Sequence, residues 1–182
     1  GAILEFDFVA VGDSLVFNYV FASSEYTGYT CSSFNDAFGF FLSGPGLSGP
    51  YTNGAVNLAL VPGGNIPVTI NTVNSGFPTG GPASTCAALD PNWQANAVYF
   101  TTVNGAFSGQ GYNGSTVAMV ALSGLVCGGT YHIKLAICNV TDQALDSGVF
   151  LEANSFSSNA VTIEAQASLF SGSFTDTTLA EG

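Results

Sequence analysis

The feature that most constrains the fold of this chain is a two-residue alternation of apolar and polar side chains. In residues 4–8, leucine and phenylalanine alternate with glutamate and aspartate. Successive side chains of a β-strand point to opposite faces, so this pattern predicts a strand with one buried face. Residues 15–21 repeat the pattern after Gly12-Asp13-Ser14, and we expect the two runs to form a β-hairpin around that turn.

Further stretches with this pattern recur along the chain, separated by glycine, proline and asparagine. β-Branched and aromatic residues occupy their apolar positions, and no stretch shows a 3.6-residue period over ten residues. These features predict an all-β protein, an antiparallel, jelly-roll-like β-sandwich with two long loops at residues 23–35 and 72–96. The further predicted strands are 37–43, 55–61, 67–71, 97–103, 116–122, 130–139 and 147–153, with 160–165 and 168–175 near the C-terminus.

The charge composition excludes several classes of function. The 182 residues include one lysine, no arginine and twelve carboxylates, with a formal net charge of -11. Nucleic acids and anionic membrane surfaces both require basic side chains, so we expect neither as a partner. No apolar run reaches the length of about 18 residues typical of a transmembrane helix, so membrane insertion is not expected. A hydrophobic content of 47% argues against disorder, and the length suits one domain.

The four cysteines predict an oxidising, extracellular environment and two disulfides. Cys127 and Cys138 flank the predicted strand 130–139, and an extended strand holds them too far apart to pair. Of the remaining arrangements we favour Cys31–Cys138 with Cys86–Cys127, because Cys31 and Cys138 lie near the same acidic end of the predicted sandwich.

Acidic and amide side chains gather in the predicted loops. Ca²⁺ takes six to eight oxygen ligands, commonly from such loops, and a bound divalent ion would lower the self-repulsion of an acidic chain. The sequence therefore predicts a calcium cofactor; the alternative is that the same side chains cap turns. The candidate ligands are Glu25, Asn35, Asp36, Asp142 and Asp146.

Three long segments resemble a known family. They are FASSEYTGYTCSSFNDAFGFFLSGPG (residues 21–46), NLALVPGGNIPVTINTVN (57–74) and TYHIKLAICNVTDQALDSGVFLEANSFSS (130–158). In this order they are similar to the choice-of-anchor L domain of secreted Bacteroidota-type surface proteins, over residues 2–158. The resemblance implies an exported, β-rich domain at the cell surface, and it implies no established biochemical activity.

Two further groups of side chains have alternative interpretations. His132, the single histidine, cannot form a multi-histidine zinc site, and we expect it to be exposed or paired across strands. Tyr26, Tyr29 and Trp93 lie in the predicted loops. They would stack on sugar rings in a calcium-dependent, lectin-like module, or else pack the loops against the sheets.

Catalysis is not expected, although a glycoside hydrolase is an alternative interpretation. Such an enzyme needs two carboxylates about 5–9.5 Å apart, and Glu25 with Glu152 or Asp36 would be candidates. With twelve acids in the chain, some such pair is expected without any catalytic role.

The ends of the chain suggest an assembly. In the resembled family, further sequence precedes the segment similar to AILEFDF, and residues 159–182 extend beyond the family's end. A sandwich that lacks a strand exposes an apolar groove. A C-terminal strand of one subunit would fill this groove in the next and build a head-to-tail fibre. The alternative is that the extension folds onto its own sandwich. The candidate assembly residues are Val161, Ile163, Leu169, Phe170 and Phe174.

We therefore expect a sandwich domain over residues 1–158 and a strand-forming extension over 159–182. The predicted function is that of a non-catalytic, secreted structural or adhesive protein at the cell surface. Its predicted partners are copies of itself, joined in a fibre, together with surface glycans.

Overall fold

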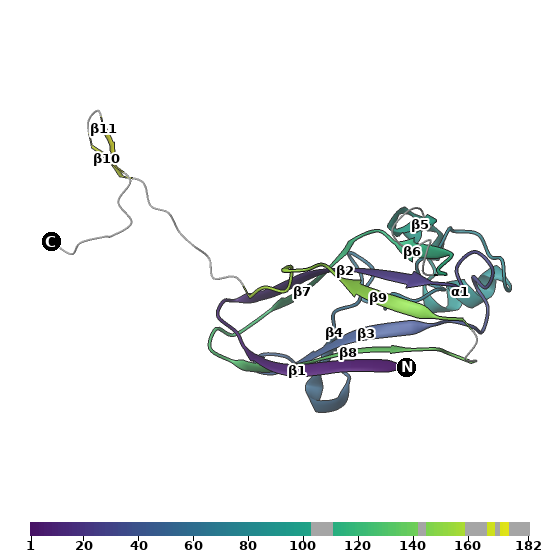
Figure 1. Ribbon diagram of the computed structural model, residues 1–182, viewed down its shortest axis with the longest axis horizontal. Coiled ribbons are helices and arrows are strands. Elements are labelled where there is room, and N and C mark those ends of the chain that lie inside the picture. Colours follow the sequence, from purple (N-terminus) through teal and green to yellow (C-terminus); the bar gives the residue numbers. More distant parts are fainter. Residues whose placement is uncertain (103–110, 142–144, 159–166, 170–171, 175–182) are drawn as a thin grey trace.

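The chain folds into two antiparallel sheets, as predicted. The computed structural model describes residues 1–102, 111–141 and 145–158, together with the backbone of 167–169 and 172–174. The two sheets face each other as an open sandwich (Figure 1). One sheet has the order β1 (Ala2–Val9), β8 (Thr130–Cys138), β3 (Ala37–Ser43), β4 (Val56–Asn57). The other has the order β5 (Phe100–Thr102), β6 (Gly114–Thr116), β2 (Ser14–Ser23), β7 (Met119–Gly124), with β9 (Ser147–Leu151) also paired to β2.

The predicted hairpin between the first two strands is wrong. β1 pairs with β8 in one sheet, whereas β2 pairs with β7 in the other. The connecting segment crosses between the sheets at the buried Ala10, whose amide donates to the carbonyl of Gly129 at 2.9 Å. Alternation specifies which face of a strand is buried, but it does not specify which neighbour pairs with its edge. The same alternation therefore occurs in strands of two different sheets, with one face of β2 buried and the apolar face of β1 buried only in part.

Aromatic side chains fill the centre of the sandwich. The ring of Phe40 on β3 lies 5.1 Å from Phe17 and 4.9 Å from Tyr19, both on β2. Phe21 stacks on Phe38 with ring centroids 4.7 Å apart. All of these rings are buried, and such pairs add about 0.5–1.5 kcal/mol each beyond area burial. The alternating runs thus supply the two inner faces of one core.

The shorter predicted strands were located less well. The structure confirms residues 37–43 and places β8 and β9 within the predicted ranges 130–139 and 147–153. The predicted strand 55–61 is reduced to β4, and 67–71 forms only isolated bridges, because Thr72 Oγ1 accepts the Thr69 amide. Residues 116–122 divide between β6 and β7, and a 3₁₀ helix, η2 (Trp93–Tyr99), occupies the start of 97–103. The predicted strand 160–165 lies outside the described residues, and 168–175 corresponds in part to the paired strands β10 (Ala167–Leu169) and β11 (Gly172–Phe174).

The two predicted long loops pack against each other at one end of the sandwich, and we call them the linked loops (residues 24–36 and 72–99). The second loop contains α1 (Ala83–Leu89) and η2. Asn71, just before it, accepts the Cys31 amide at 2.7 Å and donates to the Ser32 carbonyl at 2.8 Å. In the second loop, Asn96 donates to the Thr72 carbonyl at 2.8 Å. Asparagine side chains thus replace strand pairing as partners for these backbone groups.

The predicted disulfide pairing is wrong. Cys31 is bonded to Cys86 on α1, and Trp93 forms a small buried cluster with this disulfide. Cys127 and Cys138 are exposed free cysteines near opposite ends of β8, so the prediction that they do not pair with each other is confirmed. The pairing follows from contact between the linked loops, because the amide of Gly80 donates to the Thr30 carbonyl at 2.9 Å.

Within the described residues, the helices are too short and too polar to cross a bilayer.

Candidate functional site

The two sheets leave a gap between their edge strands β1 and β9. In the described part of the chain, β1 pairs only with β8, and β9 pairs only with β2. The outer edge of β1 therefore presents unpaired backbone amides and carbonyls. An exposed edge of this kind is a template for another strand.

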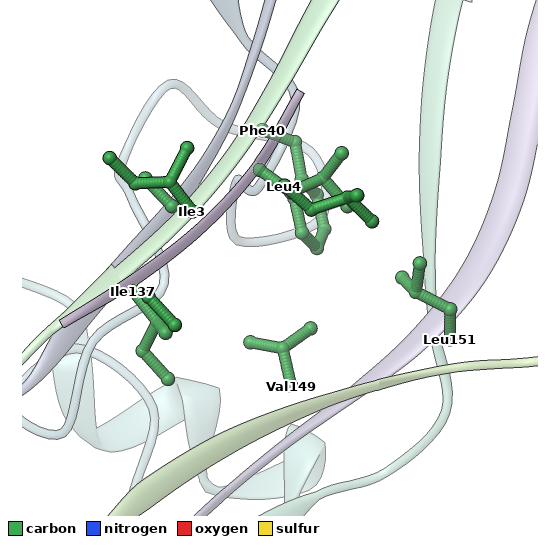
Figure 2. Close-up of a pocket in the computed structure, with 9 residues that line it drawn as sticks. Ile3, Leu4, Phe40, Ile137, Val149 and Leu151 are labelled. Carbon is green, nitrogen blue, oxygen red and sulfur yellow. The ribbon is translucent and has the colours of Figure 1, made fainter. Parts of the chain in front are cut away.

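An apolar pocket of about 200 Å³ opens in this gap, and we call it the edge groove. Figure 2 shows Ile137 from β8 and Val149 from β9 on opposite sides of the same space, with Leu4 above it. Leu135, Phe40 and Leu151 complete the apolar wall. Leu4 is 55% exposed and Leu151 is 43% exposed, so the inner faces of both sheets reach solvent here.

The other half of the gap is closed by the chain itself. Phe156, in the segment that follows β9, lies 5.5 Å from the rings of Phe6 and Phe8 and 5.6 Å from Phe17. Ser157 forms a bridge with Val16, so this segment runs beside β2. A large aromatic side chain thus fills one half of the gap and leaves the edge groove open in the other.

The predicted calcium ligands Glu25 and Asp36 lie close together and are buried. The amide of Asp36 donates to Glu25 Oε2 at 3.3 Å. The two carboxylate oxygens of Asp36 accept from the Val140 amide at 3.0 Å and the Ser147 hydroxyl at 2.7 Å. These contacts match the alternative interpretation, in which the acids bond to nearby groups of their own chain. Because both carboxylates are buried, neither is accessible to a glycan.

The other predicted ligands are not brought into one cluster. Asn35 accepts the Asn71 amide at 2.9 Å, and Asp146 is exposed at the start of β9. Asp142 lies outside the described residues. Among those that are described, no three histidine, cysteine, aspartate or glutamate residues are placed to hold a metal ion. Calcium binding stays a prediction.

Two of the three predicted stacking residues are inaccessible. Tyr26 and Trp93 are buried, which does not fit stacking on a ligand, whereas Tyr29 is exposed and packs against Phe34. Burial raises the pKa of the Tyr26 phenol, and the neighbouring Tyr19 raises it further. The tyrosine therefore stays neutral inside the core.

His132 is paired across strands, as predicted. Its Nδ1 lies 2.7 Å from Asp7 Oδ1, and the adjacent outward-facing Lys134 lies 3.4 Å from Glu5. Both pairs follow from the register of β1 on β8. Sequence reasoning missed Val149 and Leu151 as groove residues and Phe156 as the residue that closes the other half of the gap, although their apolar character was visible in 147–156.

The predicted assembly residues lie outside the described residues or in a separate small sheet. Val161, Ile163 and Phe170 lie outside the described residues. Leu169 and Phe174 lie in β10 and β11, which form a sheet separate from the sandwich.

Comparison with known families agrees with the resemblance seen in the sequence. The model of the choice-of-anchor L domain matches residues 1–157. No curated protein and no solved structure is detectably similar to the chain. The family and the Cys31–Cys86 disulfide indicate a secreted or surface protein. Because the match extends over most of the 182 residues, the chain belongs to the choice-of-anchor L domain family.

Proposed function

We propose that this protein is a non-catalytic, extracellular structural and adhesive subunit that joins copies of itself by exchanging a β-strand. The edge groove is the observation that carries this proposal, because it combines an unpaired strand edge with an open apolar pocket. Strand addition needs both, since the backbone edge supplies affinity and the pocket selects alternate side chains.

The occupant we propose is the segment 160–165 of a second copy. In an extended chain Val161, Ile163 and Ala165 point to one face, and Thr162 and Glu164 point to the other. The apolar face would enter the edge groove beside Leu4 and Val149, while the polar face would remain in solvent. Added to β1, the segment would also satisfy the free amides and carbonyls of that edge.

The direction of the preceding segment favours a second copy over the same chain. This segment passes Phe156 and reaches Ser158, whose hydroxyl accepts the Gly12 amide at 3.0 Å. Gly12 lies beyond the C-terminal end of β1, whereas the edge groove lies near its N-terminal end at Leu4. The same chain would have to reverse within about two residues to enter its own groove. An incoming copy meets no such requirement, and its head-to-tail contact builds a fibre.

Electron microscopy and sedimentation of three variants test the proposal. We expect filaments from the full chain, and monomers after deletion of residues 159–182 or after Leu4→Asp, which places a charge in the groove. Val120→Asp is the matched control, because Val120 is 58% exposed on β7 outside the groove. It should assemble normally.

Assembly of the truncated chain would contradict the proposal. So would a monomeric full chain whose segment 160–165 is protected from hydrogen exchange, since this result would place the segment in its own groove.

A further inference from the structure

A second pocket lies on the outer face of the sheet that contains β1, on the side away from the edge groove. It encloses about 400 Å³, within the range of small-molecule sites. Its floor comes from β1, β8 and β3, and its wall comes from the turn that contains η1 (Thr52–Gly54), the blue turn below β1 in Figure 1. We call it the outer pocket. Its main side chains are those of Glu5, Phe41, Tyr51, Asn53, His132 and Lys134.

Strand register brings the polar groups of the floor together. Glu5, Lys134 and Phe41 lie side by side across β1, β8 and β3. Two residues earlier on β8, and on the same face, His132 lies between Asp7 of β1 and Ser43 of β3. The single lysine and the single histidine of the chain therefore occupy one pocket.

Two aromatic rings stand beside these polar groups. Tyr51 lies edge-on to Phe41 with ring centroids 4.8 Å apart, and Tyr51 is 40% exposed. A side chain at Gly39 would collide with the Phe41 ring, so glycine makes room for that ring on the sheet surface. Asn53, in the left-handed region at φ 60°, directs the turn around the pocket. The pocket thus combines an apolar ring surface with hydrogen-bonding groups.

The charges of the pocket select against ionic ligands. Glu5 Oε2 lies 3.4 Å from Lys134 Nζ and 3.8 Å from His132 Nε2, so the ammonium and the imidazole already face a carboxylate. An anion would meet Glu5 and Asp7 in a chain of net charge -11, and a cation would compete with Lys134. A neutral hydroxyl can donate to the carboxylate and accept from the ammonium, and it leaves the ion pair intact. The side chains of Glu5, His132 and Lys134 remain 41–49% exposed and can reach such a ligand.

We propose that the outer pocket binds a neutral saccharide. Vicinal hydroxyl groups of a sugar ring would bond to Glu5, Lys134 and Asn53, and the apolar face of the ring would pack on Tyr51. This site does not depend on strand exchange or on a metal.

A glycan array of neutral and acidic oligosaccharides, read with and without EDTA, tests the proposal on the full chain. We expect neutral glycans to bind, unchanged by EDTA, and titration of the best one to shift backbone amide signals of β1, β8 and residues 51–55. Tyr51→Ala should weaken binding about tenfold or more, and Tyr51→Phe should retain it.

Phe77→Ala is the control, because Phe77 is a 72% exposed aromatic residue that does not line the outer pocket. It should bind like the unmodified chain. Equal loss in the two alanine variants, binding of acidic glycans alone, loss of binding in EDTA, or silence of the whole array would overturn the proposal. Filament formation is scored separately on the same samples, so failure of this site is distinguishable from failure of strand exchange.

Discussion

The linked loops and the edge groove lie in one small sandwich, but they are stabilised in opposite ways. In the linked loops a disulfide joins the two segments, and buried asparagines bond to backbone groups that have no strand partner. At the edge groove the strands are regular, yet Leu4 and Leu151 lie in solvent beside an unpaired edge. The comparison teaches that regular strands can leave apolar side chains exposed to solvent, whereas irregular loops can be well packed. The irregular linked loops exclude solvent from their disulfide, whereas the edge groove between regular strands is open to solvent.

The largest expected effect comes from breaking the link between the loops. Cys86→Ala should lower the free energy of unfolding by about 2–5 kcal/mol, because the bond constrains a long loop in the unfolded chain. Urea denaturation monitored by Trp93 fluorescence measures the change. Cys138→Ala is the control, since that exposed cysteine is free. Equal, small effects of both substitutions would contradict the importance of the disulfide.

Leucine substitutions compare a buried position and a solvent-exposed position in one sheet. Leu42 on β3 is fully buried, so Leu42→Ala should cost about 2–5 kcal/mol of unfolding free energy. Leu4→Ala on β1 should cost less than about 1 kcal/mol in the monomer, because the side chain is half exposed already. Chemical denaturation of the chain without residues 159–182 gives both values. Comparable losses would mean that the edge groove is filled in solution.

Three buried tyrosines sharpen the comparison further. The Tyr131 hydroxyl donates to the Pro45 carbonyl at 2.6 Å and accepts the Val126 amide at 2.7 Å. Among the described residues, the hydroxyls of Tyr19 and Tyr26 are buried without a hydrogen-bond partner. Tyr131→Phe should therefore cost about 1–3 kcal/mol, whereas Tyr26→Phe should be neutral or stabilising near pH 7.

Tyr19 and Tyr26 also predict that the folded chain loses stability at alkaline pH. Burial raises the pKa of Tyr26 and of Tyr19, so both bind their protons more tightly in the folded chain than in the unfolded chain. Stability is then fully present below the unfolded pKa of about 10 and is lost as the pH rises above it. Denaturation at pH 8 and pH 11 should show a smaller loss in Tyr26→Phe than in the unmodified chain. An identical loss would contradict the raised pKa.

Calcium provides the smallest expected change. The sequence predicts a site that uses some of the five candidate ligands Glu25, Asn35, Asp36, Asp142 and Asp146, and binding to the folded chain alone raises the melting temperature. Calorimetry with calcium several-fold above its dissociation constant should show a rise of about 2–4 °C. Asp146→Asn should reduce this rise. An unchanged melting temperature at millimolar calcium would contradict the site.

Local patterns predicted the strands better than they predicted the contacts between strands. The alternation in β2 identified its buried face, because it depends only on side-chain direction along one strand. The same alternation in β1 identified the strand, but Leu4 and Phe6 on its apolar face remain exposed. The partner of β1 depends on β8, more than 120 residues away, and nothing in the turn at Gly12 specifies it. The same limit explains the disulfide, since Cys31 and Cys86 meet only after two irregular loops pack together.

The candidate sites were predicted in part for related reasons. The cross-strand pairing of His132 was predictable because a strand's outward face is visible in its sequence. The burial of Glu25 and Asp36 was not predictable, because a carboxylate in a loop can be either buried or exposed. The sequence shows Tyr51 as an aromatic residue in a loop. That it lies beside Glu5 and Lys134 could not be predicted, because this depends on the register of three strands.

The position of Lys134 has a consequence for the survival of the protein outside the cell. Proteases of the trypsin type cleave after lysine and arginine, and this chain offers one such bond, between Lys134 and Leu135. That bond lies in the middle of β8, with β1 paired on one side and β3 on the other. A protease binds its substrate as an isolated extended strand, so it would first have to separate three strands of the sheet. Digestion by these enzymes should therefore follow the opening of the sandwich, and at high protease concentration it reports the rate of opening.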